Sequence, residues 1–325
     1  MKKTISFIIR AGVSGILIYL LFLQIGRENL GKLPEYAREA NYLWLAAATA
    51  LFFLALIWGI IRWGWLLKAQ NIHLSFSDLF TLTYIGFFFS NFLPGVVGGD
   101  LVKFYYLGKK TGKMSSSFTS VFMDRVIGFM GLLSIAFVAL LLNLKRTAAR
   151  EFFPLIVGAT FLLLIIFFLL LNHKFHKFLS FLYHIKWLRL GEKIQNLFQS
   201  FQTYRQSPRA LLKAYLISLL VQFQMIIIVY FISLAFHLPI PAVYFFLFFP
   251  LVAVIMSIPV SISGLGTREW AFVFFFSSLP AVSEVDALAL SLSLYLITLF
   301  TSLWGGVIYM WKGGEIRKCY TNTSE

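Results

Sequence analysis

Two glycine-rich segments of this chain carry charged residues within otherwise apolar sequence. They contain Gly98, Gly99, Asp100 and Lys103 in the first segment, and Gly264, Gly266, Thr267, Arg268 and Glu269 in the second. A helix can restart after each segment, capped by Gly99 or Asp100 in the first and by Thr267 in the second. The first turn of a helix attracts phosphate through its unpaired N–H groups and its dipole, and glycine permits close approach. The spacing therefore predicts two anion sites, with two tight loop tips as the alternative.

An adjacent pair of opposite charges, Asp124 and Arg125, stands in another apolar stretch. The pair lies roughly 10 Å from the start of that stretch at about 1.5 Å per residue. We expect Arg125 to hold a phosphate, because its planar guanidinium donates two parallel hydrogen bonds, and Asp124 to pair with Lys103 or Arg268. A purely structural ion pair is the alternative. Asp100, Asp124 and Glu269 are candidates for proton carriers or for counter-ions alike.

Patterns typical of catalysis are missing from the sequence. It has no Asp-rich metal motif and no Ser/His pair suited to nucleophilic chemistry, and the segment Gly108–Lys113 lacks the glycine spacing of a phosphate-binding loop. His173 and His176 stand beside lysines with no carboxylate near them, which disfavours a metal. We therefore expect no enzyme activity, no metal site and no cofactor.

The composition indicates an all-α polytopic membrane protein. Of 325 residues, 59% are hydrophobic and only 13% are charged, which excludes an ordinary soluble enzyme. Six apolar stretches are long enough, or nearly so, to cross a bilayer: 5–25, 42–67, 118–142, 153–171, 209–235 and 286–311. The net charge of +15 is therefore attributed to membrane orientation and anionic lipid rather than to nucleic acid.

Two further apolar regions, 76–110 and 240–280, are interrupted by Pro94, by Pro259 and by the glycines that follow them. Non-helical backbone at membrane depth is tolerated only where protein or a water-filled cavity covers it. We therefore predict a re-entrant hairpin in each region. This choice puts both termini and the basic loop 172–213 on the cytoplasmic side, as the positive-inside rule prefers, and it counts Arg62 among the cytoplasmic charges.

That topology predicts a single integral membrane domain, 1–325, built from two repeats. The repeats are 1–142 and 153–311, each with three crossings and one hairpin, and an odd number of crossings inverts the second copy. Between the crossings, 174–205 shows the amphipathic spacing of interfacial helices. These helices either bind anionic headgroups or cap the bundle.

Three motifs together resemble a known family. They are the stretch Asn91–Lys103, the pair Asp124–Arg125 and the stretch Ser263–Glu269, and they resemble the flippase-like family, the lysylphosphatidylglycerol synthase transmembrane region. The family often has Glu-Arg where this chain has Asp124–Arg125. In its best-known members the region precedes a soluble aminoacyl-transferase domain, so we expect this chain, which stops at Glu325, to be a stand-alone member.

The resemblance implies a flippase-like transporter of an anionic phospholipid or lipid-linked headgroup across the cytoplasmic membrane. Membrane lipids, bound by the charged and glycine residues above, are then the expected partners, and nucleic acid is not. The alternative is a membrane partner or subunit of a lipid- or glycan-modifying enzyme, such as a lipid synthase or a glycosyltransferase.

Overall fold

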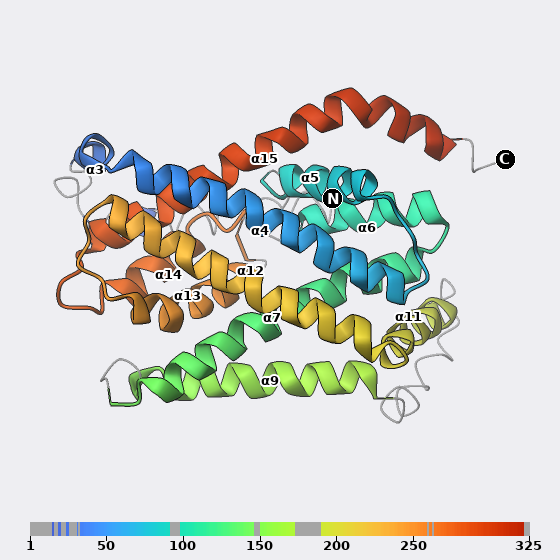
Figure 1. The fold of residues 1–325 in the computed structure, drawn as a ribbon, viewed down its shortest axis with the longest axis horizontal. Helices are drawn as coiled ribbons and strands as arrows, with labels where there is room; N and C mark the ends of the chain where they lie inside the picture. The colour runs from blue at the N-terminus through green and yellow to red at the C-terminus, as the bar shows by residue number, and fades with distance from the viewer. Residues whose placement is uncertain are drawn as a thin grey trace. The chain divides into compact units, whose positions relative to one another are not determined.

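The computed structural model describes residues 33–91, 98–145, 150–172, 190–258, 260–261 and 263–321, with a few isolated positions before residue 33. The elements in these ranges are all helices, which confirms the predicted all-α class (Figure 1). They are α3 (Leu33–Glu39), α4 (Tyr42–Ala69), α5 (Phe76–Ser90), α6 (Gly98–Thr111), α7 (Met114–Leu142), α9 (Phe153–Leu171), α11 (Leu190–Arg205), α12 (Pro208–Ala235), α13 (Ala242–Ser257), α14 (Thr267–Phe276) and α15 (Glu284–Thr321).

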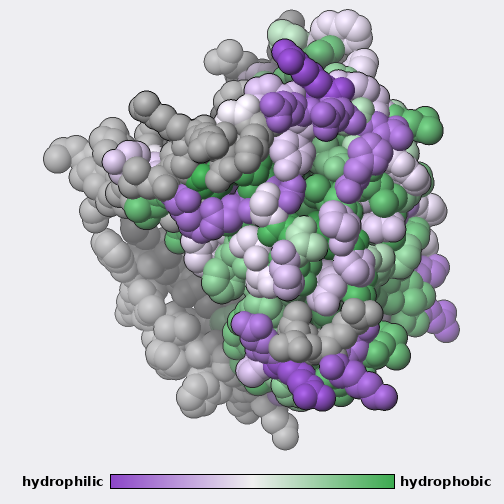
Figure 2. All heavy atoms as spheres, turned by 90° about the vertical axis from the view of Figure 1, so that its left-hand side faces the viewer, coloured by the Kyte–Doolittle hydropathy of each residue, from purple (hydrophilic) through white to green (hydrophobic). Residues whose placement is uncertain are grey.

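Five of the described helices are long and apolar enough to cross a membrane: α4, α7, α9, α12 and the segment Glu284–Trp311 of α15. They correspond to five of the six predicted spans. The sixth, 5–25, falls almost wholly outside the described residues. The chain is thus a multi-pass membrane protein, and Figure 2 shows one face on which hydrophobic residues prevail between separate hydrophilic patches.

Both interrupted regions form two helices on either side of a break. In 76–110 these are α5 and α6, which run antiparallel: Gly99 packs on Gly86 near one end, and Lys110 bonds Asp78 at the other. A Cβ at Gly99 would lie 1.9 Å from the Gly86 carbonyl oxygen, so only glycine fits there. Pro94 lies outside the described residues.

The second region, 240–280, contains α13 and α14, which also pack antiparallel. The ring centroids of Phe245 and Phe276 are 5.2 Å apart, which joins the start of α13 to the end of α14. Pro259, the predicted break, lies outside the described residues. A re-entrant path for the two helix pairs and an inverted relation of 1–142 to 153–311 stay predictions.

The helices form two compact units. The first unit comprises 1–55, 84–100 and 223–307, and the second comprises 56–83, 101–222 and 308–325. The boundaries fall inside α4, α5, α6, α12 and α15, so the units do not coincide with consecutive stretches of sequence. Each unit contains one of the charged clusters described below.

In the second unit, α11 packs its apolar side on α7 and α9. Phe201 and Tyr204 are buried there, and the Gln70 side-chain amide donates to the Ser200 carbonyl oxygen over 2.7 Å. The described part of the predicted amphipathic segment therefore contacts neighbouring helices, and headgroup binding by 174–205 stays a prediction. Residues 174–189 lie outside the described part of the chain.

Candidate functional site

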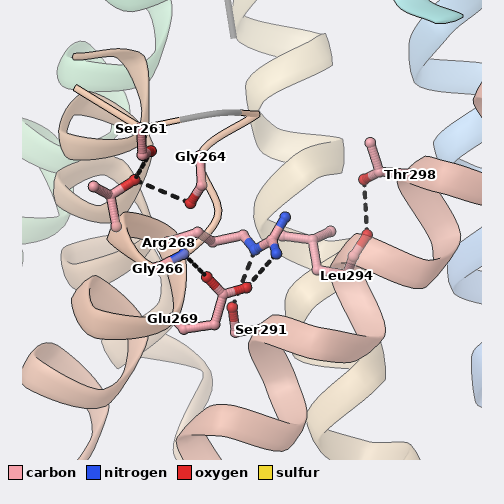
Figure 3. Close-up of polar contacts among 9 residues, drawn as sticks. Ser261, Gly264, Gly266, Arg268, Glu269, Ser291, Leu294 and Thr298 are labelled. Atoms are coloured by element: carbon pink, nitrogen blue, oxygen red, sulfur yellow. Dashed lines mark hydrogen bonds and ion pairs between the residues drawn. The ribbon is translucent and has the colours of Figure 1, made fainter. Parts of the chain in front are cut away.

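The first charged cluster is built on the turn that precedes α14, in the first unit. Ser263, Gly264 and Gly266 all adopt positive φ angles, of 52°, 76° and 84°, a region that glycine enters at little cost. The Thr267 hydroxyl donates to the Gly264 carbonyl oxygen over 3.0 Å and lies 2.9 Å from the Ser261 hydroxyl. These bonds hold the turn in the shape from which α14 starts (Figure 3).

Arg268 and Glu269, the first charged residues after the turn, form a buried ion pair. Their exposed fractions are 3% and 5%, and Arg268 Nη2 donates to Glu269 Oε1. The other carboxylate oxygen accepts the Gly266 backbone N–H over 2.7 Å. Glu269 therefore fills the N-terminal turn of α14, where the sequence predicts an exogenous anion.

The guanidinium of Arg268 is also fixed from α15. Its Nε donates to the Ser291 hydroxyl over 3.2 Å, and its central carbon lies 4.3 Å from the centroid of the Tyr295 ring. Among the described residues, Arg268 Nη1 has no hydrogen-bond acceptor, and Figure 3 shows this nitrogen outside the bonded group. The side chain is thus held rigidly, and its Nη1 nitrogen keeps its N–H groups for a further ligand.

The second charged cluster lies in the second unit, where α4, α7 and α12 meet. Arg62 binds Asp124 through two bonds, Nε to Oδ1 at 2.8 Å and Nη2 to Oδ2 at 3.1 Å. Its remaining nitrogen, Nη1, donates to the Ser218 hydroxyl over 3.2 Å. The two ionised side chains are 10% and 14% exposed, so this pair is largely removed from solvent.

Small residues on α7 make room for this arrangement. A Cβ at Gly128 would lie 3.4 Å from Arg62 Nη1, and one at Gly131 would lie 2.7 Å from Ser218 Oγ. Asp124, Gly128 and Gly131 recur at helical spacing and so share one face of α7. That face accommodates both the guanidinium and the close approach of α12.

Lys103, on α6, brings further positive charge to the same cluster. It is 7% exposed, and its ammonium lies 3.7 Å from the centroid of the Trp63 ring, a cation–π geometry. Asp124 is attracted electrostatically by Arg62, by Lys103 and by the half-buried Arg125. The positive charges of three side chains, on α4, α6 and α7, thus act on the Asp124 carboxylate.

The structure brings together some of the predicted site residues and adds one. Lys103, Asp124 and Arg125 gather in the second unit, and the second glycine segment gathers in the first unit. Gly98 and Gly99 are buried in the first turn of α6, and Asp100, half-buried, follows them.

The ion pair that Asp124 forms is with Arg62, whereas the sequence suggests Lys103 or Arg268. Arg62 is not a cytoplasmic loop residue: it is buried within α4. An arginine inside an apolar run is itself a signal of a polar interior, so the sequence already contained a signal that could have identified Arg62 as the partner of Asp124.

Among the described residues, no three His, Cys, Asp or Glu side chains gather in a group that could bind a metal ion. Beside the carboxylates of Asp124 and Glu269, the two clusters contain guanidinium, ammonium, hydroxyl and backbone N–H groups, which recognise oxyanions.

The fold and the two clusters define the class: a multi-pass helical membrane protein with ionised side chains buried among its helices. Residues 7–305 match the model of the lysylphosphatidylglycerol synthase TM region, and the chain belongs to that family. The predicted family membership is thereby confirmed.

Two curated relatives are similar to the chain. The UPF0104 membrane protein of Methanothermobacter thermautotrophicus is 24% identical over 89% of this chain and 90% of its own length. The UPF0104 membrane protein PH1989 of Pyrococcus horikoshii is 28% identical over 51% of this chain, and the match spans about half of that relative (48%). No solved structure matches the chain.

Proposed function

We propose that the chain translocates a lipid with an anionic headgroup across the membrane, and that Arg268 binds the headgroup phosphate. The observation that carries the proposal is a buried guanidinium in a multi-pass protein, fixed by Glu269, Ser291 and Tyr295 with a donor to spare. The family, named after the membrane region of a phospholipid synthase, supports a lipid as the ligand.

The second cluster supplies another station for an anion in this proposal. Arg62, Lys103 and Arg125 all attract the carboxylate of Asp124, and the same kind of attraction can draw an anionic headgroup to this cluster. Charged groups inside a membrane are costly and typically mark the path of a polar substrate. Lys103 and Arg125 act here as contacts for the headgroup, and Arg62 holds Asp124 in place.

The test measures translocation of fluorescent phosphatidylglycerol in proteoliposomes. An impermeant quencher removes the fluorescence of probe in the outer leaflet, so the remaining fluorescence reports probe that is still in the inner leaflet. Wild-type protein should expose the inner-leaflet probe, and both Arg268→Ala and Arg125→Ala should slow this at least tenfold. Arg150→Ala is the matched control, because Arg150 is an exposed arginine outside both clusters. Failure of the wild-type protein to move the probe, or full activity in Arg268→Ala, would refute the proposal.

A second probe separates headgroup recognition from general membrane disturbance. Fluorescent phosphatidylcholine carries a phosphate but no net charge, so it should move more slowly than phosphatidylglycerol. Equal rates for the two probes would argue against an anionic substrate.

We also propose that the protein resides in the cytoplasmic membrane with both termini on the cytoplasmic side. Single cysteines in a Cys319→Ser background test this orientation at two exposed positions that lie beyond span ends. Lys145→Cys should react with an impermeant maleimide from outside intact cells, and Gln206→Cys only after lysis. The opposite pattern would invert the topology.

A further inference from the structure

We propose that the Glu269 carboxylate occupies the phosphate site when no lipid is bound and is protonated when a headgroup takes its place. One proton is then taken up for each monoanionic headgroup that binds, and the proton and the lipid cross the membrane together. This inference rests on the proposed function and adds its energy source. It starts from what the carboxylate of Glu269 does in the structure: it occupies two donors that a phosphate would seek, the Gly266 N–H and Arg268 Nη2.

The contact between Glu269 and Arg268 is not an ordinary helix-surface pair. Neighbouring residues on a helix point in different directions and do not normally face each other. Here the Glu269 carboxylate reaches back to the Gly266 N–H and also meets the Arg268 guanidinium in the interior, with exposed fractions of 5% for Glu269 and 3% for Arg268. The carboxylate therefore occupies the place of an anion at the helix N-terminus.

Charge balance then links the phosphate to a proton. Arg268 and Glu269 together are neutral, and adding a phosphodiester would leave one uncompensated negative charge in a buried site. Two anions around one guanidinium repel strongly where the dielectric is low. If Glu269 accepts a proton from water, its acid no longer competes for Nη2, and Arg268 with the phosphate is neutral again.

Within the described parts of α13, α14, α15 and the turn before α14, no second carboxylate is placed to make the same exchange. The turn 260–266 has no titratable side chain, α14 carries none besides Arg268 and Glu269, and α13 carries only Tyr244. From α15, Tyr295 stacks on the guanidinium. The carboxylates at the start of that helix are engaged elsewhere: Glu284 accepts from Gln24, and Asp286 accepts from Tyr36 and from Ser283 N–H.

The balance of the step is simple. On binding, a proton from the aqueous phase forms an O–H bond on Glu269, and the headgroup oxygens take over the bonds from Arg268 and Gly266 N–H. On release, the acid returns its proton to water and the carboxylate regains both donors. For a monoanionic headgroup the bound site carries no net charge, so translocation is electroneutral and follows the pH gradient.

The experiment measures proton uptake when dihexanoyl-phosphatidylglycerol binds the purified full-length protein in weakly buffered detergent with a pH indicator. Wild type should take up about one proton per lipid bound, and its dissociation constant should rise up to tenfold per pH unit once Glu269 is ionised. The pH dependence of the dissociation constant is measured on wild-type protein, so it tests the proposal even if a variant fails to fold.

Two matched variants complete it. Glu269→Gln keeps an oxygen for the Gly266 N–H but does not titrate, so binding should persist without proton uptake and without pH dependence. Glu284→Gln changes a carboxylate outside the site and should behave as wild type.

The outcomes separate the two proposals. Lipid binding without proton uptake and at constant affinity across pH overturns the coupling alone. Absence of binding at every pH, with translocation also absent, overturns the proposed function and the coupling with it. An unchanged proton stoichiometry in a folded Glu269→Gln protein assigns the proton to another group and overturns this inference.

Discussion

Replacing Asp124 with asparagine should strongly destabilise the second unit. The substitution leaves Arg62 buried and charged, with one acceptor oxygen where two carboxylate oxygens now lie at 2.8 and 3.1 Å. Removing one partner of a buried ion pair costs about 3–5 kcal/mol. The amide oxygen of the introduced side chain and the bond from Arg62 to Ser218 offset part of the loss, so we expect about 3 kcal/mol, roughly a hundredfold change in the folding equilibrium.

The assay is reversible unfolding in mixed detergent micelles, followed by the fluorescence of the eight tryptophans. Asp78→Asn is the matched control, because it breaks the 2.5 Å ion pair between Asp78 and Lys110. The side chains of Asp78 and Lys110 are 37% and 39% exposed. Exposed pairs contribute about 0–1 kcal/mol, so this variant should unfold close to wild type. If Asp124→Asn lost no more stability than Asp78→Asn, the idea of a desolvated, mutually dependent pair would be wrong.

Two further predictions concern packing and pH. Gly131→Ala should destabilise the protein by about 1–3 kcal/mol, because the added methyl would lie 2.7 Å from Ser218 Oγ. Gly158→Ala is the control, because a Cβ there would have nothing within 4 Å, and it should be neutral or slightly stabilising in the same unfolding assay. Burial, then the hydrogen bond to Asp286, raises the pKa of Tyr36 from 10.0 to about 12, so folding gains stability below pH 10 that is lost as the pH rises to about 12. Phenolate absorbance should show this late titration, and Tyr36→Phe should abolish it; a titration of Tyr36 near pH 10 in folded protein would contradict it.

The spans were predictable because bilayer thickness imposes a length on apolar helices, whatever their neighbours. α9 illustrates this: its predicted range, 153–171, is the range observed. The helix breaks were predictable for a similar local reason, since glycine at 264 and 266 allows backbone angles that other residues resist. Charged residues within apolar sequence, such as Arg268 and Asp124, could also be identified as candidate site residues from the sequence alone.

The partners of those charges were not predictable, because they depend on which helices meet. Asp124 finds Arg62, which lies 62 positions earlier in the chain, and Ser218 reaches the same guanidinium from α12. The role of Glu269 was hidden for another reason. Sequence reasoning places an external anion at the start of α14, but a carboxylate three residues after Gly266 is long enough to fold back and take that place itself.

The difference in helix length between α9 and its neighbours bears on the bilayer itself. With 19 residues, α9 is about 28 Å long, whereas α4 and α12, with 28 residues each, reach about 42 Å. Phe161, Ile165 and Phe168 on α9 are more than half exposed and so meet acyl chains directly. At about 28 Å, α9 matches the roughly 30 Å hydrocarbon core of a typical bilayer, whereas the longer helices must tilt or extend beyond that core. Acyl-chain length is therefore a property of the host membrane to which this protein is physically matched.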